Sequence, residues 1–346
     1  MFIQRFKKIH KSNQYRVNSK MDKTIHTERM CLTEHKTLCL NSIHAQYTFG
    51  GNLGDGSFYS VRKARFHYSG DFFAIKIINK SNITQKEHLR LNNEIEIMQE
   101  LSECDKIVPL FDFFDEPENV YFVYKMMNGK EIPKSLTYYS SFEEPQARQI
   151  LSSILQAVSF IHSKDIVHRG LNSESILCIS QEERYLSVKL TDFTYAKKET
   201  KLDSFTTMCG PPGYIAPEIL QGTSYGKKVD VWSLGVIAFN LLARRQPFQG
   251  EDEKSVQNAI MNCDFSFEDE IWGNISNEAK SFIELLFTLD PNRRPSSTDA
   301  ICHSWLSKSL NGIDRKLEMI TSQESENQQL KAVMLALESE NAILCI

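Results

Sequence analysis

The segment that most constrains the fold is a polar loop, His168 to Ser175, which follows a long apolar run. Apolar residues recur at helical spacing from Ile150 to Ile161, and the pair Ile166-Val167 leads directly into the loop. Beyond it, apolar and polar residues alternate from Tyr185 to Leu190, and a second loop begins with Asp192-Phe193-Thr194. This pattern predicts a helix, a polar loop, a short strand and a second polar loop.

The arrangement resembles the catalytic core of eukaryotic protein kinases, whose first loop is H-R-D-L-K-P-E-N and whose second is D-F-G. Here the first loop is His-Arg-Gly-Leu-Asn-Ser-Glu-Ser. By this resemblance Gly170 stands at the position of the catalytic base, Asn172 at the phosphate-facing lysine and Ser175 at the magnesium-binding asparagine. Arg169 is retained beside the missing base, and Asp192 is the expected ligand of one Mg²⁺.

Upstream motifs extend the resemblance to a nucleotide-binding lobe. The run from Leu53 to Val61 resembles the glycine-rich loop that covers the phosphates of ATP, with Tyr59 in place of its third glycine. Lys76 ends an apolar strand similar to V-A-I-K, and such a lysine needs a charged partner. Glu94 fits the family register, and Glu96 is the alternative partner. The resemblance implies nucleotide contacts from Leu53, Gly54, Gly56, Val61, Ala74, Lys76, Glu94, Met126 and Leu177.

Two further strands and a hinge are expected between the lobes. Strand-like runs extend from Ile107 to Phe114 and from Val120 to Lys125, with a proline-containing turn between them. The next segment, from Met126 to Glu131, resembles the hinge whose backbone binds adenine, and Tyr124 would gate the pocket behind it. We therefore expect an α+β fold with two lobes, a small β-rich one and a larger helical one.

The second half of the chain carries the most specific motifs. Residues 208–218 resemble the end of a kinase activation segment, closing on the A-P-E motif. Glu218, Asp230 and Arg294 are expected to be structural, with Arg294 holding Glu218 through a bidentate ion pair. Residues 263–289 are similar to the calcium/calmodulin-dependent class, and most similar to the C-terminal kinase domains of ribosomal S6 kinases and of mitogen- and stress-activated kinases.

The activation segment also suggests a regulatory site. In relatives the arginine at position 169 often holds a phosphorylated residue of this segment. A phosphate carries a charge of about −1.5 to −2 and pairs with arginine. The candidate acceptors here are Ser204, Thr206 and Thr207.

Both ends of the chain differ from the middle. Residues 1–45 hold nine Lys or Arg against three acids with little apolar periodicity, which predicts a disordered arm; a transit peptide and a basic docking arm are alternatives. The kinase-like domain is expected over 46–307, with an N-lobe at 46–126 and a C-lobe at 130–307. Residues 308–346 predict a helical tail, either folded back on the large lobe or forming a homodimer through a coiled coil at 327–346.

The composition of the chain limits its possible partners and its cellular location. The net charge of −4 disfavours a nucleic-acid partner, and no apolar run is long enough to span a membrane. The longest candidate, Val229 to Ala243, contains polar residues and predicts a buried helix. The eight cysteines form no C-x-x-C pair, which is typical of reduced thiols and predicts a cytoplasmic or nuclear protein, or both.

The replaced residues cluster on one step, phosphoryl transfer, while the fold-bearing motifs remain. We therefore expect a pseudokinase of intracellular signalling that binds a protein partner, such as an active kinase or its substrate, and binds ATP with Mg²⁺ weakly. Tyr59 and Thr194 each add a side chain where the family has glycine. The alternatives are an active or residually active serine/threonine kinase that uses Glu174 or a displaced aspartate as base, and an oligomerisation module formed by the tail.

Overall fold

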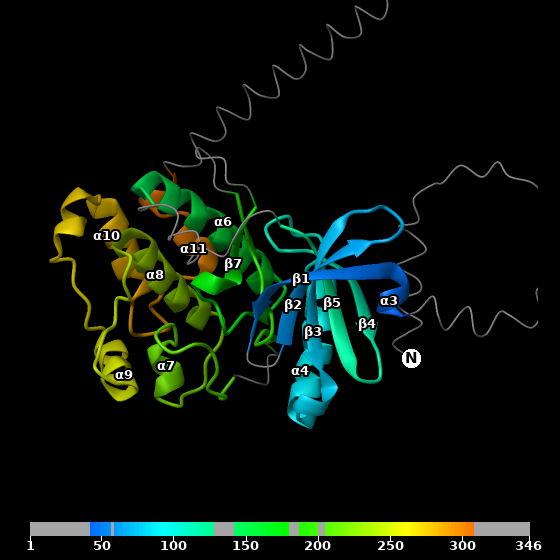
Figure 1. Cartoon of the computed structure of the whole chain (residues 1–346). Coiled ribbons are helices and arrows are strands. Elements are labelled where there is room, and N and C mark those ends of the chain that lie inside the picture. Colours follow the sequence, from blue (N-terminus) through cyan, green and yellow to red (C-terminus); the bar gives the residue numbers. More distant parts are fainter. Residues whose placement is uncertain (1–41, 57–58, 128–141, 180–186, 200–204, 308–346) are drawn as a thin grey trace, which may run out of the picture. The chain divides into compact units, whose positions relative to one another are not determined.

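The computed structural model describes residues 42–56, 59–127, 142–179, 187–199 and 205–307. The predicted arm, apart from residues 42–45, and the predicted tail lie outside these ranges, as do Glu131 of the hinge and Ser204. Ile43–Gln46 form a short helix, α3, which belongs to a separate unit from the rest. From Tyr47 onward the chain has a β-sheet part and a helical part, as the α+β prediction required (Figure 1).

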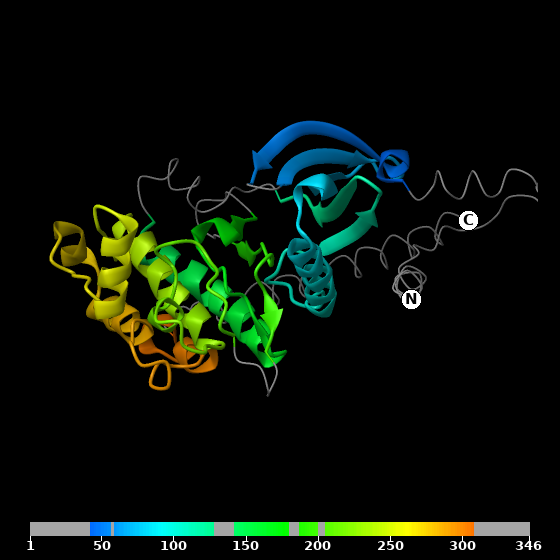
Figure 2. The same cartoon turned by 90° about the horizontal axis from the view of Figure 1, so that it is seen from below.

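The first part is a five-stranded antiparallel sheet in the order β1-β2-β3-β5-β4. Its central strands, β3 and β5, are rich in β-branched and aromatic residues, which suit a strand covered on its faces. Helix α4 lies beside the sheet in both views (Figures 1 and 2). The strands are β1 (Tyr47–Asp55), β2 (Tyr59–Phe66), β3 (Phe72–Asn79), β4 (Leu110–Asp115) and β5 (Asn119–Lys125).

Helix α4 (Gln85–Glu100) starts at a capping box. The Thr84 hydroxyl accepts a hydrogen bond from the Glu87 amide, and the Glu87 carboxylate accepts one from the Thr84 amide. Asn93 on this helix donates to the Ala196 carbonyl at 2.7 Å, which ties α4 to the helical part of the chain. This hydrogen bond therefore connects α4, which lies beside the sheet, to the second polar loop.

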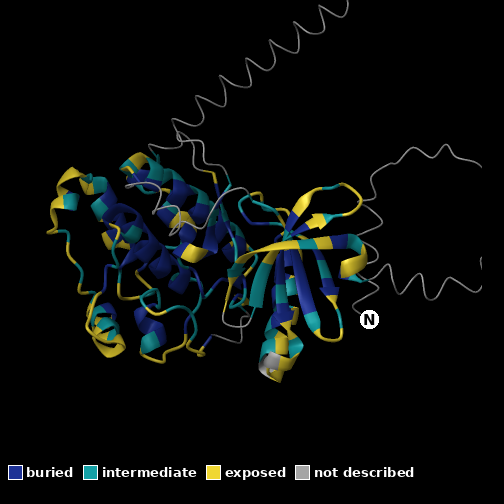
Figure 3. Cartoon of the chain, viewed as in Figure 1, coloured by how far each residue is buried: buried dark blue, intermediate teal, exposed yellow. Residues whose placement is uncertain are grey.

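The helical part is built around α8 (Lys228–Ala243), which is mostly dark blue in Figure 3. Apolar residues occupy every face of this helix, so it is buried as the sequence predicted. It ends at Arg244, which takes a left-handed conformation with φ of 56°. Among the described residues, the other helices of this part are α6 (Glu144–Ser163), α7 (Pro217–Leu220), α9 (Glu253–Asn262), α10 (Asn277–Leu286) and α11 (Ser297–Ile301). The 3₁₀ segments in the same ranges are η1 (Lys80–Asn82), η2 (Ser173–Ser175) and η3 (Glu270–Asn274).

Two short ribbons position the polar loops. β6 (Ile166–Val167) pairs with β9 (Lys197–Lys198), and β7 (Ile176–Cys178) pairs with β8 (Val188–Leu190). The first polar loop connects β6 to β7 and the second connects β8 to β9. Each polar loop therefore has a short strand at both ends. Each of these strands pairs with a strand at one end of the other loop.

The predicted strand from Ile107 to Phe114 is wrong at its start. Strand β4 begins only at Leu110, because the preceding residues pair with β8 instead. Ile107 forms an isolated parallel bridge with Leu190, and the Val108 amide donates to the Leu190 carbonyl at 2.9 Å. An apolar run is expected for either pairing, so the sequence pattern could not separate them.

The predicted strand at 185–190 appears as Val188–Leu190, and its first two residues lie outside the described ranges. Within those ranges, no helix has the length and apolar character needed to cross a membrane.

Candidate functional site

Lys76 and Glu94 form the ion pair that the sequence predicted. Lys76 Nζ lies 3.1 Å from Glu94 Oε1, and both side chains are almost fully buried. The alternative partner, Glu96, is exposed on the same helix. Burial lowers the pKa of the Lys76 ammonium, but the Glu94 and Asp192 carboxylates outweigh it, so the pKa lies above its ordinary value and the group stays charged.

The Thr194 hydroxyl joins this pair to Asp192. It donates to Asp192 Oδ1 at 2.6 Å, and it accepts a hydrogen bond from Lys76 Nζ at 3.0 Å. Asp192 has a left-handed backbone with φ of 61°. Burial raises the pKa of its carboxyl, but Lys76 and the Thr194 hydrogen bond outweigh this, so the pKa lies below its ordinary value. Thr194 therefore bridges the two groups on which nucleotide and metal binding were expected to depend.

Tyr59 closes the same region from the glycine-rich loop. The centroid of its ring lies 4.9 Å from Lys76 Nζ. The ring also packs against Gly56, where an added Cβ would come within 2.4 Å of Tyr59 Cε1. The amide of Gly56 donates to the Tyr59 carbonyl at 2.8 Å, which closes the hairpin. Gly56 thus leaves room for a side chain of this chain, although the resemblance implied that it leaves room for phosphate.

The expected adenine-side residues come from several strands. Val61 on β2 faces Lys76 in the β2–β3 register, and Ala74 on β3 faces Tyr124 on β5. Leu53 is 42% exposed. Gly54, Met126 and Leu177 are partly exposed as well, and the nucleotide contacts of the whole set stay a prediction.

Asp230 of α8 holds the first polar loop, His168 to Ser175. We call it the catalytic-type loop because it resembles the kinase motif. The buried Asp230 carboxylate accepts hydrogen bonds from the amides of His168 and Arg169, each at 2.9 Å, and from His162 Nε2 at 2.8 Å. Arg169 itself adopts a left-handed backbone with φ of 61°. Asp230 therefore fixes the start of the loop through the two amide hydrogen bonds.

Within that loop, Gly170 carries no side chain and is covered by a neighbour. A Cβ built on Gly170 would lie 2.8 Å from Cδ2 of Tyr195, which is closer than real contacts allow. Tyr195 directly follows Thr194, and nothing in its sequence position indicates where the ring points. The place where the family's base would begin is occupied by this ring.

The other two replaced positions are bonded to each other and to the loop backbone. The Asn172 side chain donates to the Gly170 carbonyl at 2.9 Å and accepts from the Glu174 amide at 2.7 Å. The Ser175 hydroxyl donates to the Asn172 carbonyl at 2.7 Å and accepts from the Asn172 amide at 3.1 Å. These contacts cap the η2 turn. Both side chains serve the local fold of the loop.

Arg169 already has partners in the activation segment. Its guanidinium carbon lies 4.7 Å from the centroid of the buried Phe205 ring, and its Nε donates to the Tyr195 carbonyl at 2.8 Å. Phe205 is bridged to Tyr225 through backbone hydrogen bonds of 3.1 and 2.9 Å in the two directions. Thr206 and its neighbour at 207 are exposed, and phosphorylation there stays a prediction.

The predicted ion pair between Glu218 and Arg294 is present and bidentate. Arg294 Nη1 and Nη2 donate to the two Glu218 oxygens at 2.7 and 3.0 Å. Three further donations from Arg294 reach the carbonyls of Lys228, Thr288 and Leu289. Arg294 has no exposed surface, so the pair locks the end of the activation segment to the helical core.

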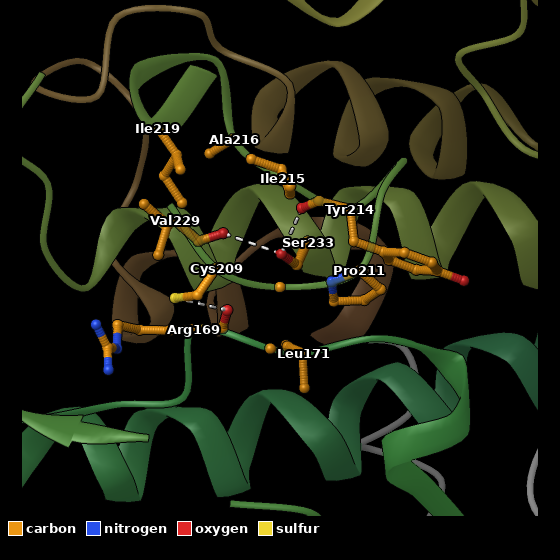
Figure 4. Close-up of a pocket in the computed structure, with 12 residues that line it drawn as sticks. Arg169, Leu171, Cys209, Pro211, Tyr214, Ile215, Ala216, Ile219, Val229 and Ser233 are labelled. Atoms are coloured by element: carbon orange, nitrogen blue, oxygen red, sulfur yellow. Dashed lines mark hydrogen bonds between the residues drawn. The ribbon is translucent and has the colours of Figure 1, made fainter. Parts of the chain in front are cut away.

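A pocket lies between the catalytic-type loop and the activation segment (Figure 4). Gly170 and Leu171 line one side, and Cys209, Pro211 and Tyr214 line another. In Figure 4 the sulfur of Cys209 points toward the Arg169 carbonyl, 3.9 Å away. Pro211 offers no hydroxyl at the position where many serine/threonine kinases have threonine. The lining has no carboxylate side chain that could act as a base.

The groups expected to bind phosphate and metal are already bonded within the chain. Lys76 is charged and paired with Glu94, and it also donates to the Thr194 hydroxyl. Of the expected metal ligands, Asp192 holds a hydrogen bond from Thr194, and the position of the second ligand is Ser175, whose hydroxyl is used within the loop. Among the described residues, no group of three or more His, Cys, Asp or Glu is arranged to hold a metal ion.

Comparisons with known proteins agree with the fold. The protein kinase domain family matches residues 47–306. The chain is 35% identical over 277 residues to myosin light chain kinase A of Dictyostelium discoideum, which covers 80% of this chain and 93% of that protein. It is 37% identical over 267 residues to calcium/calmodulin-dependent protein kinase type 1 of Caenorhabditis elegans, covering 77% and 76%. The finer likeness to ribosomal S6 and stress-activated kinases stays a prediction.

Proposed function

Because this chain belongs to the protein kinase family, we propose that it is a pseudokinase, which uses the fold to bind protein partners and transfers no useful amount of phosphate. The observation that carries the proposal is the covered glycine at position 170. No carboxylate extends from this position, and the Tyr195 ring fills the space where one would start. The hydrogen bonds that engage Asn172 and Ser175 within the loop support the same conclusion.

The expected loss of rate follows from the chemistry of phosphoryl transfer. Kinases position ATP and the acceptor, neutralise phosphate charge with lysine and Mg²⁺, and hold the acceptor hydroxyl with an aspartate; their kcat is about 1–100 s⁻¹. Losing a general base typically costs ~10²–10⁴-fold in rate, and losing one electrostatic stabiliser costs roughly 10²–10³-fold. These groups act as a unit, so the factors do not multiply, but their joint loss is expected to leave a rate of little use in signalling.

A transfer assay tests the proposal. Radiolabelled ATP with Mg²⁺ and a basic serine/threonine peptide is expected to give no signal above that of Lys76→Met, which removes the phosphate-binding amine. Robust transfer by the wild-type protein that Lys76→Met abolishes would overturn the pseudokinase proposal. Nucleotide binding is measured apart from transfer: ATP at 100 times its Kd stabilises a binding protein by about 2.7 kcal/mol, which a melting curve detects.

The second candidate is an active serine/threonine kinase, and the names of the relatives favour it, since both are kinases. It needs a base, and the sequence offers Glu174. The backbone amide of Glu174 donates a hydrogen bond to the Asn172 side chain. Because the residue is exposed, its carboxylate would have to act from the surface of the loop. Glu174→Gln distinguishes the candidates: it abolishes any transfer if this carboxylate is the base.

The partner belongs to the proposal as well. We propose a protein that binds the kinase-like domain in the cytoplasm or nucleus, such as an active kinase or one of its substrates. The reduced cysteines and the acidic net charge support this setting. The alternative of an oligomerisation module falls on residues 327–346, outside the described ranges, and light scattering with and without the tail tests it.

A further inference from the structure

Two side chains that stand where the family has glycine converge on the same lysine. Thr194 lies in the second polar loop and Tyr59 at the end of the glycine-rich loop, 135 positions earlier. Both are directed at Lys76 Nζ, one through a 3.0 Å hydrogen bond and the other through a ring centroid at 4.9 Å. We propose that Tyr59 and Thr194 form an internal plug, which competes with phosphate and divalent metal for Lys76 and Asp192.

The surroundings of the ammonium group explain why the competition is direct. An ammonium has three donor hydrogens. Lys76 uses them toward the Glu94 carboxylate and the Thr194 hydroxyl, and the rings of Tyr59 and Phe122 face the same group at 4.9 and 5.4 Å. The side chain is only 8% exposed. A phosphate oxygen that approached Lys76 would have to displace the Thr194 hydroxyl or the Tyr59 ring.

The metal end is affected through Asp192. Its Oδ1 accepts a 2.6 Å hydrogen bond from Thr194, so a cation at this oxygen would have to share it with the Thr194 hydroxyl. Thr194 has one hydroxyl hydrogen, and directing it to Asp192 leaves the oxygen lone pairs to face Lys76. The Thr194 hydroxyl thus binds the Lys76 ammonium and the Asp192 carboxylate at once. In an active site, phosphate would bind the ammonium and a metal ion would bind the carboxylate.

Gly56 supports the other half of the plug. The Tyr59 ring fits under the loop only because position 56 has no side chain, since a Cβ there would lie 2.4 Å from the ring. The retained glycine therefore stabilises a closed site. This inference rests on the weak nucleotide binding in the proposed function and gives the cause of the weakness.

The test measures binding and leaves transfer aside. We would compare wild type with Tyr59→Gly/Thr194→Gly, which restores both family glycines. Two titrations are followed by calorimetry, ATP with MgCl₂ and ATP with EDTA. A third, Mn²⁺ alone, is followed by electron paramagnetic resonance. The double variant is expected to bind ATP with MgCl₂ at least tenfold more tightly than wild type, a gain of about 1.4 kcal/mol, and EDTA is expected to abolish that gain.

Matched controls isolate the two groups. Tyr59→Phe keeps the ring and Thr194→Ser keeps the hydroxyl, so both are expected to bind like wild type. Adding Asp192→Asn to the double variant is expected to remove the gain and the Mn²⁺ signal. If the double variant fails to fold by circular dichroism, Thr194→Ala and Tyr59→Ser are measured singly against the same tenfold threshold.

Two results would overturn the plug. One is a wild-type protein whose ATP affinity already rises tenfold with MgCl₂, and the other is a folded glycine variant with no gain. Failure of the proposed function has a different signature, because it requires phosphate transfer by the wild-type protein. A plug without transfer, transfer without a plug, and the absence of both are therefore distinguishable.

Discussion

Replacing Gly170 by alanine tests whether Tyr195 really covers the position of the missing base. The backbone at Gly170 has no left-handed strain, so the substitution is judged on sterics alone. Its new Cβ would lie 2.8 Å from the Tyr195 ring, inside a buried loop. The centroid of the Tyr195 ring lies 5.7 Å from the guanidinium carbon of Arg90. The backbone carbonyl of Tyr195 accepts a hydrogen bond from Arg169 Nε.

Two effects of opposite sign set the magnitude. Gly→Ala at a compatible backbone stabilises by about 0.4–1 kcal/mol, because the unfolded chain loses freedom. Forcing a methyl group into a packed site costs about 1–3 kcal/mol. The steric cost is larger, so we expect Gly170→Ala to lower the free energy of unfolding by about 1–2 kcal/mol, or the melting temperature by roughly 2–8 °C.

A double-mutant cycle measured by urea unfolding separates the two effects. In a Tyr195→Ala background the ring is gone, and Gly170→Ala is expected to become neutral or stabilising, giving a coupling energy of about 1–3 kcal/mol. Gly273→Ala is the matched control, since nothing lies within 4 Å of its added Cβ. The reasoning is refuted if Gly170→Ala stabilises the wild-type protein as much as Gly273→Ala does.

The same contact governs any attempt to restore catalysis. Gly170→Asp with Ser175→Asn supplies a base and a metal ligand, but the new carboxylate starts against the Tyr195 ring. We therefore expect measurable peptide phosphorylation only when Tyr195→Ala is added. Equal activity with and without the third change would contradict this expectation.

Three further outcomes follow from the packed side chains. Arg294→Met leaves the buried Glu218 carboxylate unpaired and is expected to cost about 3–5 kcal/mol in urea unfolding; a cost under about 1 kcal/mol would contradict the role of the pair. Phe205→Ala removes the ring that stacks on Arg169 and is expected to speed amide exchange across residues 205–215; unchanged protection would show that the backbone bridge alone holds the segment. Burial raises the pKa of the Asp230 carboxyl, but the hydrogen bonds from His162 and the loop amides lower it below its ordinary value near 3.9, so stability is expected to fall as pH drops below about 4. Asp230→Asn lacks that titration and is the control for the acid limb.

Much of the fold could be predicted from the sequence because burial imposes local rules. An apolar helix with few polar residues has to be buried, and α8 is. A lysine inside an apolar strand needs a carboxylate, and Glu94 supplies it. Boundaries were less certain, since the apolar run that precedes β4 could pair with either of two strands. The predicted arm and tail, and the nucleotide contacts, stay predictions.

The sequence by itself determined which functional groups the first polar loop carries. A glycine at position 170 has no side chain to accept a proton, whatever the fold, and an asparagine at position 172 cannot replace the charge of a lysine. These statements depend only on functional groups, so they needed no coordinates. The Glu218–Arg294 pair was predicted from the resemblance to the kinase family, and the structure contains it.

Only the tertiary structure decided what occupies the vacated space. The ring of Tyr195 over Gly170, the hydroxyl of Thr194 between Lys76 and Asp192, and the ring of Phe205 on Arg169 all depend on rotamers and on distant chain segments. Sequence spacing does not specify these directions, since each side chain has several staggered rotamers and packing selects one. The physical reason is that a missing group leaves room, and which neighbour fills it is a property of the whole packed core.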